Sequence, residues 1–280
     1  MFDFALPPPT VIAPTRVGPV IVSVPHSGRE IPAELARAAR GGDRSIERLA
    51  DPYVDFLVEP LLDEGHGAVI ARAPRAAIDV NRSVDACDPQ VHLDAAPPPA
   101  DSKAARGLGI VIGRGVDGKP LWRDKLPDDA FERWLDSAWH PYHRALEDLI
   151  DRTRARHGVA ILLDCHSMPP LSARGPFVVI GDRFGQSAAP WVSGVVEALL
   201  EDRALPHATN RPYAGGEIAA AHGRPADNVH VLQIEIDRSL YLDRNLRRPG
   251  AGIGRIQSLL TAMAARLEDA AQSETLRAAE

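Results

Sequence analysis

The stretch ILLDCHSMPP, residues 161–170, decides how this chain folds, because an apolar run ends there on polar residues and a Pro-Pro pair. Such a run predicts a buried strand that leads into a loop. In open α/β sheets, the loops beyond the carboxyl ends of the strands are where ligands bind. The polar residues 164–167 therefore lie where we expect a functional site.

Other short runs also have the composition of strands: PVIVSV (19–24), GAVIARA (67–73), FVVIG (177–181) and VHVLQIEI (229–236). Apolar residues at three- and four-residue steps predict helices between them, over 128–157, 187–202 and 253–271. Strands that alternate with helices predict an α/β fold with a layered sheet. The Pro-rich insertion 94–109 is too short to mark a domain boundary, so we expect a single domain over 1–280 in which this segment forms a lid or surface loop.

The composition limits the classes of partner. The 280 residues are 45% hydrophobic and 25% charged, as is ordinary for a globular protein. The net charge of -6 argues against nucleic acid as a partner. A small anionic substrate would fit only if arginines near the binding site supply positive charge. The chain has two cysteines, too few for a disulfide framework, so we expect a cytoplasmic protein. The sequence shows neither a signal peptide nor a run of about 18 apolar residues, so we expect no membrane partner. The oligomeric state stays unknown.

Three polar side chains stand at or near the ends of predicted strands. His26 follows the run 19–24, His166 follows 159–164, and Glu235 is flanked by isoleucines in 229–236. Imidazoles and a carboxylate hold zinc in metal hydrolases, where a second carboxylate takes a proton from water. The alternatives are that each histidine is an ordinary hydrogen-bonded residue and that Glu235 points to solvent.

The run AIDVNRSVD, residues 77–85, places Arg82 directly after Asn81. A guanidinium matches a carboxylate through two parallel hydrogen bonds, so this residue would orient an acidic substrate. The alternative is a surface salt bridge with Asp79 or Asp85.

Taken together, these stretches resemble the N-formylglutamate amidohydrolase family. The resemblance rests on motifs that run in the family's order from about residue 20 to 245: VSVPHSGREIP, DPYVDFL, DVNRSVD, GLGIVIGR, HPYHRAL, LLDCHSMP, NRPYAGGEIAAAHGRP and LQIEIDRSLYLD. It implies a zinc-exopeptidase-like fold, in which a mixed β-sheet is sandwiched between helices.

The resemblance also implies a metal site. His26 and His166 correspond to metal ligands, and the family has an acid at the position of Asp51 as the third. Carboxypeptidase relatives instead use an acid three residues after the first histidine, where this chain has Arg29. The implied cofactor is a divalent metal, Zn²⁺ by its ligands.

Further roles follow from the same resemblance. Glu235 corresponds to the general base, while Asn81 and Arg82 correspond to the pair that grips the substrate α-carboxylate. Arg174 and Arg211 lie in matching stretches and either meet a side-chain carboxylate or are surface charges. His143 either serves the site or braces a loop.

The implied activity is metal-dependent hydrolysis of N-formyl-L-glutamate to formate and L-glutamate, a step of histidine degradation. One alternative keeps this chemistry on another N-acyl amino acid or a small peptide. A second alternative is a non-catalytic homologue that binds an acidic metabolite.

Overall fold

The computed structural model describes residues 2–278 and divides the chain into two compact units. Among the described residues, the first unit comprises 2–10, 25–51 and 70–145, and the second comprises 11–24, 52–69 and 146–278. The single-domain organisation expected from the sequence stays a prediction.

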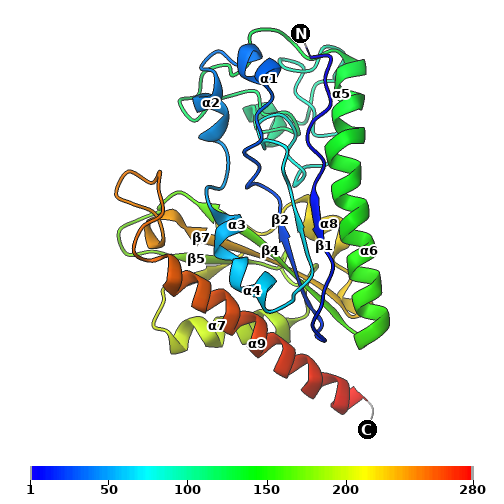
Figure 1. The fold of residues 1–280 in the computed structure, drawn as a ribbon, viewed down its shortest axis with the longest axis vertical. Helices are drawn as coiled ribbons and strands as arrows, with labels where there is room; N and C mark the ends of the chain where they lie inside the picture. The colour runs from blue at the N-terminus through cyan, green and yellow to red at the C-terminus, as the bar shows by residue number, and fades with distance from the viewer. Residues whose placement is uncertain (1, 279–280) are drawn as a thin grey trace. The chain divides into compact units, whose positions relative to one another are not determined.

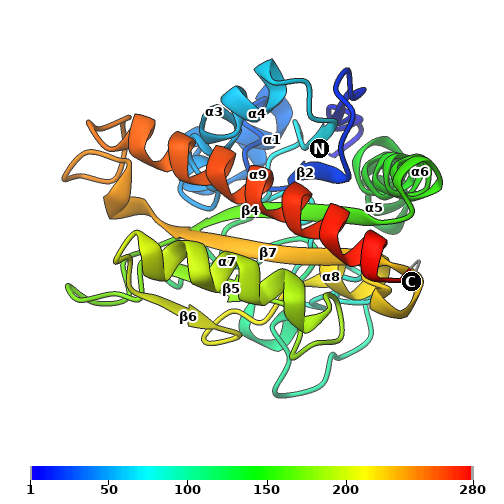
Figure 2. The same ribbon diagram turned by 90° about the horizontal axis from the view of Figure 1, so that it is seen from below.

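A seven-stranded sheet carries two of the polar residues singled out above, His166 and Glu235. Its strands are arranged in the order β1-β3-β2-β4-β7-β5-β6 (Figures 1 and 2). Their bounds are β1 Thr10–Ile12, β2 Val20–Val24, β3 Ala68–Ile70, β4 Ala160–Met168, β5 Val178–Gly181, β6 His207–Thr209 and β7 Val229–Asp237. The predicted α/β class with a mixed sheet is confirmed.

Strands β4 and β7 form the centre of this sheet, and every residue of both is buried. β4 runs parallel to β2 and to β7, whereas β5 runs antiparallel to β7 and parallel to β6. In the β4–β7 register, His166 lies opposite Glu235. Because side chains alternate along a strand, the two residues share one face of the sheet.

Helices cover the sheet in the second unit. α7 (Pro190–Asp202) packs against α9 (Ile253–Ala278), and the two lie side by side across the sheet (Figures 1 and 2). The short helices α3 (Val54–Leu57) and α4 (Glu59–Asp63) also contact α9, while α8 (Glu217–His222) packs against β7. The long helices thus follow the predicted ranges, with α9 extending further.

The first unit has its own apolar core. Its regular elements are α1 (Ala33–Ala38), α2 (Asp43–Glu47), a 3₁₀ turn (Ala104–Arg106) and α5 (Asp128–Trp134). Trp122 and Trp134 are among the buried side chains of this core, and the ring of Phe2 meets both edge-on. The segment 94–109 belongs to this unit, and its proposed role as a lid stays a prediction.

The helix predicted over 128–157 is continuous in its path but not uniform. α5 leads into a π-helical stretch, Leu135–Trp139, and then into α6, His140–His157. The proline at position 141 has no N–H to donate within this continuous helix, and the π-helical stretch ends directly before α6. A π-helical turn therefore separates α5 from α6. None of the helices within residues 2–278 is long and apolar enough to cross a membrane.

Candidate metal centre

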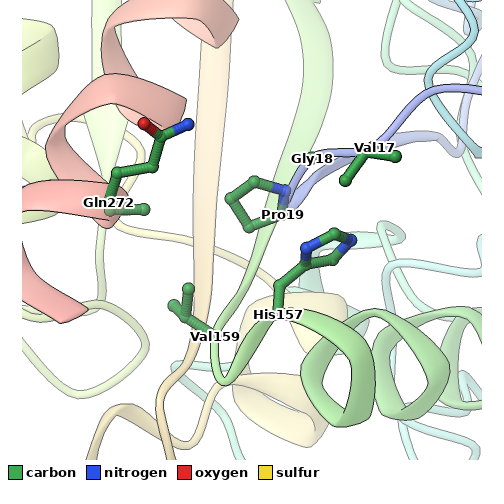
Figure 3. Close-up of a pocket in the computed structure, with 7 residues that line it drawn as sticks. Val17, Gly18, Pro19, His157, Val159 and Gln272 are labelled. Carbon is green, nitrogen blue, oxygen red and sulfur yellow. The ribbon is translucent and has the colours of Figure 1, made fainter. Parts of the chain in front are cut away.

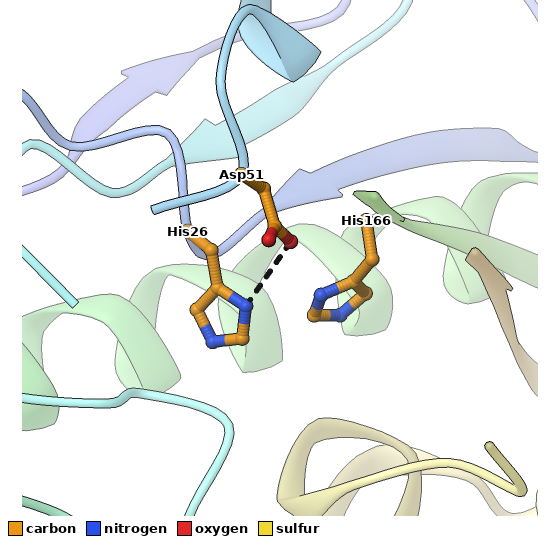
Figure 4. Close-up of side chains that lie close together, drawn as sticks. All are labelled: His26, Asp51 and His166. Carbon is orange, nitrogen blue, oxygen red and sulfur yellow. Dashed lines mark hydrogen bonds and ion pairs between the residues drawn. The ribbon is translucent and has the colours of Figure 1, made fainter. Parts of the chain in front are cut away.

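His26 and Asp51 lie next to each other in the first unit. The backbone N–H of Asp51 donates to the carbonyl of His26 at 2.9 Å, which aligns the two segments. Nδ1 of His26 lies 3.3 Å from Oδ2 of Asp51 (Figure 4), and both side chains are buried. The acid at Glu30, one position beyond Arg29, is exposed.

A second carboxylate, Asp79, holds the other side of the His26 ring. Oδ1 of Asp79 lies 2.7 Å from Nε2 of His26 and also accepts the backbone N–H of Asn81. Arg75 donates its Nε–H to Oδ2 at 3.0 Å. With the carboxylate accepting from Nε2, the lone pair of the His26 ring is on Nδ1, beside Asp51.

Charge keeps Asp79 ionised although it is fully buried. Burial raises the pKa of its carboxyl, but the electrostatic influence of His26, Arg82 and Arg75, together with the hydrogen bond to His26, lowers that pKa by more. The net result is a pKa well below the ordinary value for aspartate. A metal-bound histidine usually donates the N–H of its other ring nitrogen to a carboxylate of this kind.

His166 has the same kind of support in the second unit. It lies inside β4 and not beyond the end of the strand, which corrects the expectation from the sequence, because the pairing with β7 continues to Met168. Its Nε2 lies 3.0 Å from Oδ2 of Asp164, two residues earlier on the same strand face. The hydroxyl of Ser23, on β2, donates to the other oxygen of Asp164 at 2.7 Å.

Three of these side chains form a group that could hold a metal ion. Each of His26, Asp51 and His166 offers one ligand atom, and these atoms lie within 4.8 Å of one another (Figure 4). Two imidazole nitrogens and one carboxylate oxygen are a donor set that suits zinc in catalytic sites. The donors present therefore fit the metal implied by the sequence.

Glu235 is buried on β7, with an exposed fraction of 8%, so the alternative of a solvent-facing side chain is excluded. Its Oε1 accepts a hydrogen bond from Nε2 of Gln233 at 3.0 Å. A buried carboxylate is costly unless hydrogen bonds or charges compensate for its lost hydration. The Gln233 contact provides one such bond.

The segment after Asp79 presents Arg82 and Asn81 in the first unit. Arg82 is partly buried, donates to the carbonyls of Leu108 and Asn81, and has Nη2 4.0 Å from Asp79. This distance is the longest that counts as a salt bridge, so the alternative of an Arg82–Asp79 ion pair is only weakly fulfilled. The hydrogen bonds to the two backbone carbonyls hold the guanidinium group in its orientation.

The remaining sequence candidates lie in different settings. Arg174 and Arg211 are both exposed. Nε2 of His143 lies 2.8 Å from the carbonyl of Val80, so this histidine braces the loop that carries Arg82. Cys165 is fully buried, and burial together with the neighbouring Asp164 raises the pKa of its thiol far above the usual value, as expected for a packing residue.

Sequence reasoning missed the supporting residues Asp79, Asp164 and Gln233. Asp79 entered only as a salt-bridge alternative, Asp164 entered only as one of the polar residues 164–167, and Gln233 had no role. The signal that could have found the last two is their spacing, because each stands two residues before a candidate on a strand and must share its face.

A pocket in the second unit lies away from these residues. It has a volume of about 370 Å³ (Figure 3) and is lined by Val17, Gly18, Pro19, His157, Val159 and Gln272 among others. Pro19 and Val159 immediately precede β2 and β4, so the pocket lies at the amino ends of these strands, opposite to His166.

Comparisons with known proteins show which family and fold this chain resembles. The sequence profile described as N-formylglutamate amidohydrolase matches residues 18–242. N-formylglutamate deformylases from Pseudomonas aeruginosa and Pseudomonas putida are 31% and 29% identical over 243 and 240 residues, each alignment covering 80% of this chain and 82% of the relative. The crystal structure of N-formylglutamate amidohydrolase from Ralstonia eutropha JMP134 is 30% identical, with a TM-score of 0.85 over 95% of this chain and 99% of that one. A gene product of Agrobacterium tumefaciens, 18% identical, shares the fold with a TM-score of 0.67 over 96% and 95%.

Proposed function

Because the chain belongs to the N-formylglutamate amidohydrolase family, we propose that it hydrolyses N-formyl-L-glutamate to formate and L-glutamate. The observation that carries the proposal is the grouping of His26, Asp51 and His166, with a carboxylate behind each imidazole. A site built in this way suits hydrolysis of an amide, and the family membership supplies the substrate class.

The metal in this proposal is a divalent cation, Zn²⁺ by its donor set, held by His26, Asp51 and His166. When bound, it polarises the formyl carbonyl and lowers the pKa of a water ligand toward about 7. Asp79 and Asp164 keep the two rings in the tautomer that presents Nδ1.

Glu235 is the general base in this scheme. Its carboxylate takes a proton from the attacking water and returns that proton to the departing amine nitrogen, which leaves as the free α-amino group of glutamate. The side chain of Glu235 is buried, so little bulk water competes for its carboxylate.

The substrate is a small anion with two carboxylates, and arginines receive it. Arg82, with Asn81, holds the α-carboxylate and so converts a loose encounter into an oriented one. Arg174 and Arg211 are the candidates for the side-chain carboxylate, since both are exposed cations in segments that match the family.

A formate-release assay combined with metal analysis tests the proposal. Protein purified in zinc should release formate from N-formyl-L-glutamate, lose this activity with a chelator and regain it when Zn²⁺ is returned. N-acetyl- and N-succinyl-L-glutamate serve as competing substrates, and faster turnover of either would reassign the acyl group. Full activity without metal would refute the metal-dependent scheme, and tight binding without any turnover would favour a binding protein.

A further inference from the structure

We propose that Gln233 is a positioning residue that aims the carboxylate of Glu235, an inference that rests on the proposed role of Glu235 as base. Both residues lie on β7, two positions apart, so their side chains share one face of the sheet. Nε2 of Gln233 donates to Oε1 of Glu235 at 3.0 Å, and both side chains are buried.

A backbone contact fixes the direction of the Gln233 amide. The N–H of Gly216 donates to Oε1 of Gln233 at 3.0 Å. The two ends of a glutamine amide have nearly the same shape, and only their partners assign them. Because a backbone N–H can only donate, the carbonyl end of Gln233 must face Gly216, and the NH₂ end must face Glu235.

The segment that provides this N–H is itself held in place. Gly215 has a φ of 121°, a conformation that side chains other than that of glycine rarely adopt. A Cβ at Gly215 would come 2.9 Å from the Arg183 side chain and 3.2 Å from Ala219. α8 begins at Glu217 and packs against β7. The loop, Gln233 and Glu235 thus form one connected series of contacts.

The hydrogen bond from Gln233 restricts the orientation of the Glu235 carboxylate, which matters for catalysis. A buried carboxylate that accepts a fixed N–H loses the freedom to rotate its oxygens, and a base must be held close to its productive orientation. Misplacement of a reacting group by about 1 Å can cost about 100-fold in rate. Gln233 therefore acts through Glu235 and not on the substrate.

Replacement of the amide by an isosteric apolar group tests this role. In Gln233→Met, we expect kcat for formate release to fall about 10- to 100-fold, while KM and bound metal stay unchanged. Gln257→Met is the matched control, because Gln257 also donates its Nε2–H at 3.0 Å, but to the backbone carbonyl of Phe56. Gln233→Glu is a second variant that keeps an acceptor for Gly216 and removes the donor, and it should also lower kcat.

A double-mutant cycle separates positioning from a purely structural role. In the Glu235→Gln background, Gln233→Met should cause no further loss of kcat, because the group that it positions is already absent. Normal kcat in both Gln233 variants, or an equal loss in the two backgrounds, would overturn the inference.

The inference and the proposed function can fail separately. If the wild-type protein releases no formate, the proposed function fails, and the Gln233–Glu235 contact is then judged from unfolding in urea. The same two substitutions should show non-additive effects on the free energy of unfolding. Additive effects would overturn the inference in that case.

Discussion

Nε2 of His166 lies 3.0 Å from Oδ2 of Asp164, and Ser23 donates its hydroxyl to the opposite oxygen of the same carboxylate at 2.7 Å. The register of β2 and β4 sets this arrangement, since Ser23 and Asp164 are paired residues of neighbouring strands. The sheet itself therefore orients the imidazole.

Removal of the charge at this position should weaken metal binding. In Asp164→Asn, we expect a 10- to 100-fold lower affinity for Zn²⁺, because the carboxylate no longer fixes the tautomer and basicity of His166. Competition with a chromogenic chelator measures this affinity without any substrate. Asp182→Asn is the control, since Asp182 is also a buried acid that accepts a serine hydroxyl, from Ser193 at 2.6 Å. Equal affinities in the two variants would contradict the prediction.

Loss of the base should separate metal binding from turnover. We expect Glu235→Gln to retain its metal and to release formate about 10²- to 10⁴-fold more slowly, because an amide cannot accept the proton from water. Single-turnover assays and metal analysis of the same sample test both parts. Glu197→Gln is the comparison, since Glu197 accepts the hydroxyl of Thr209 and is not a candidate site residue. Wild-type rates in Glu235→Gln would remove this residue from the mechanism.

A change of arginine to lysine should affect substrate binding. Arg82→Lys loses the planar pair of donors, so we expect KM for N-formyl-L-glutamate to rise about 10- to 100-fold. An analogue without the α-carboxylate should show no such difference between variant and wild type. Arg154→Lys is the control, because Arg154 also donates its Nε–H to a backbone carbonyl, that of Asp227. If the wild type, Arg82→Lys and Arg154→Lys have the same KM, Arg82 does not bind the substrate and only stabilises its own loop.

The thiol of Cys165 should be inert in the folded protein. Burial, with Asp164 close by, raises its pKa, and burial also raises the pKa of Cys87 to about 11. Both thiols are therefore protonated at pH 8, and we expect negligible reaction with a disulfide reagent until the protein unfolds. Because the unfolded thiols ionise near 9, stability should also fall as pH rises through that value. Rapid labelling of Cys165 at pH 8 would contradict its buried position.

His230 should contribute to acid sensitivity. Burial lowers its pKa from 6.5 to about 4, so the folded protein holds the ring neutral while the unfolded chain binds a proton below about 6.5. The free energy of unfolding should fall as pH drops through this window, by roughly 3 kcal/mol in total. Urea unfolding at pH 7 and pH 4 should show a smaller loss in His230→Gln. If the free energy of unfolding falls as much in His230→Gln as in the wild type, other groups cause the acid sensitivity.

The sequence by itself determined the α/β class, the positions of the long helices and strands, and the identity of His26, Asp51, His166 and Glu235 as candidates. Burial of a strand on both faces requires an apolar run, so polar residues just after or within such runs singled out His26, His166 and Glu235, whereas Asp51 came only from the resemblance to the family. The prediction was wrong on where β4 ends, because pairing with β7, which lies about 70 residues away along the chain, extends the strand.

Only the tertiary structure decided which residues support these candidates. Asp79, Asp164 and Gln233 lie in ordinary positions of the sequence, and their roles depend on which neighbours the folded chain brings to hydrogen-bonding distance. The direction of a hydrogen bond, the burial of a carboxylate and the tautomer of a ring all follow from such contacts. Periodicity along the chain cannot encode them, because it describes which face a residue occupies and not what that face meets.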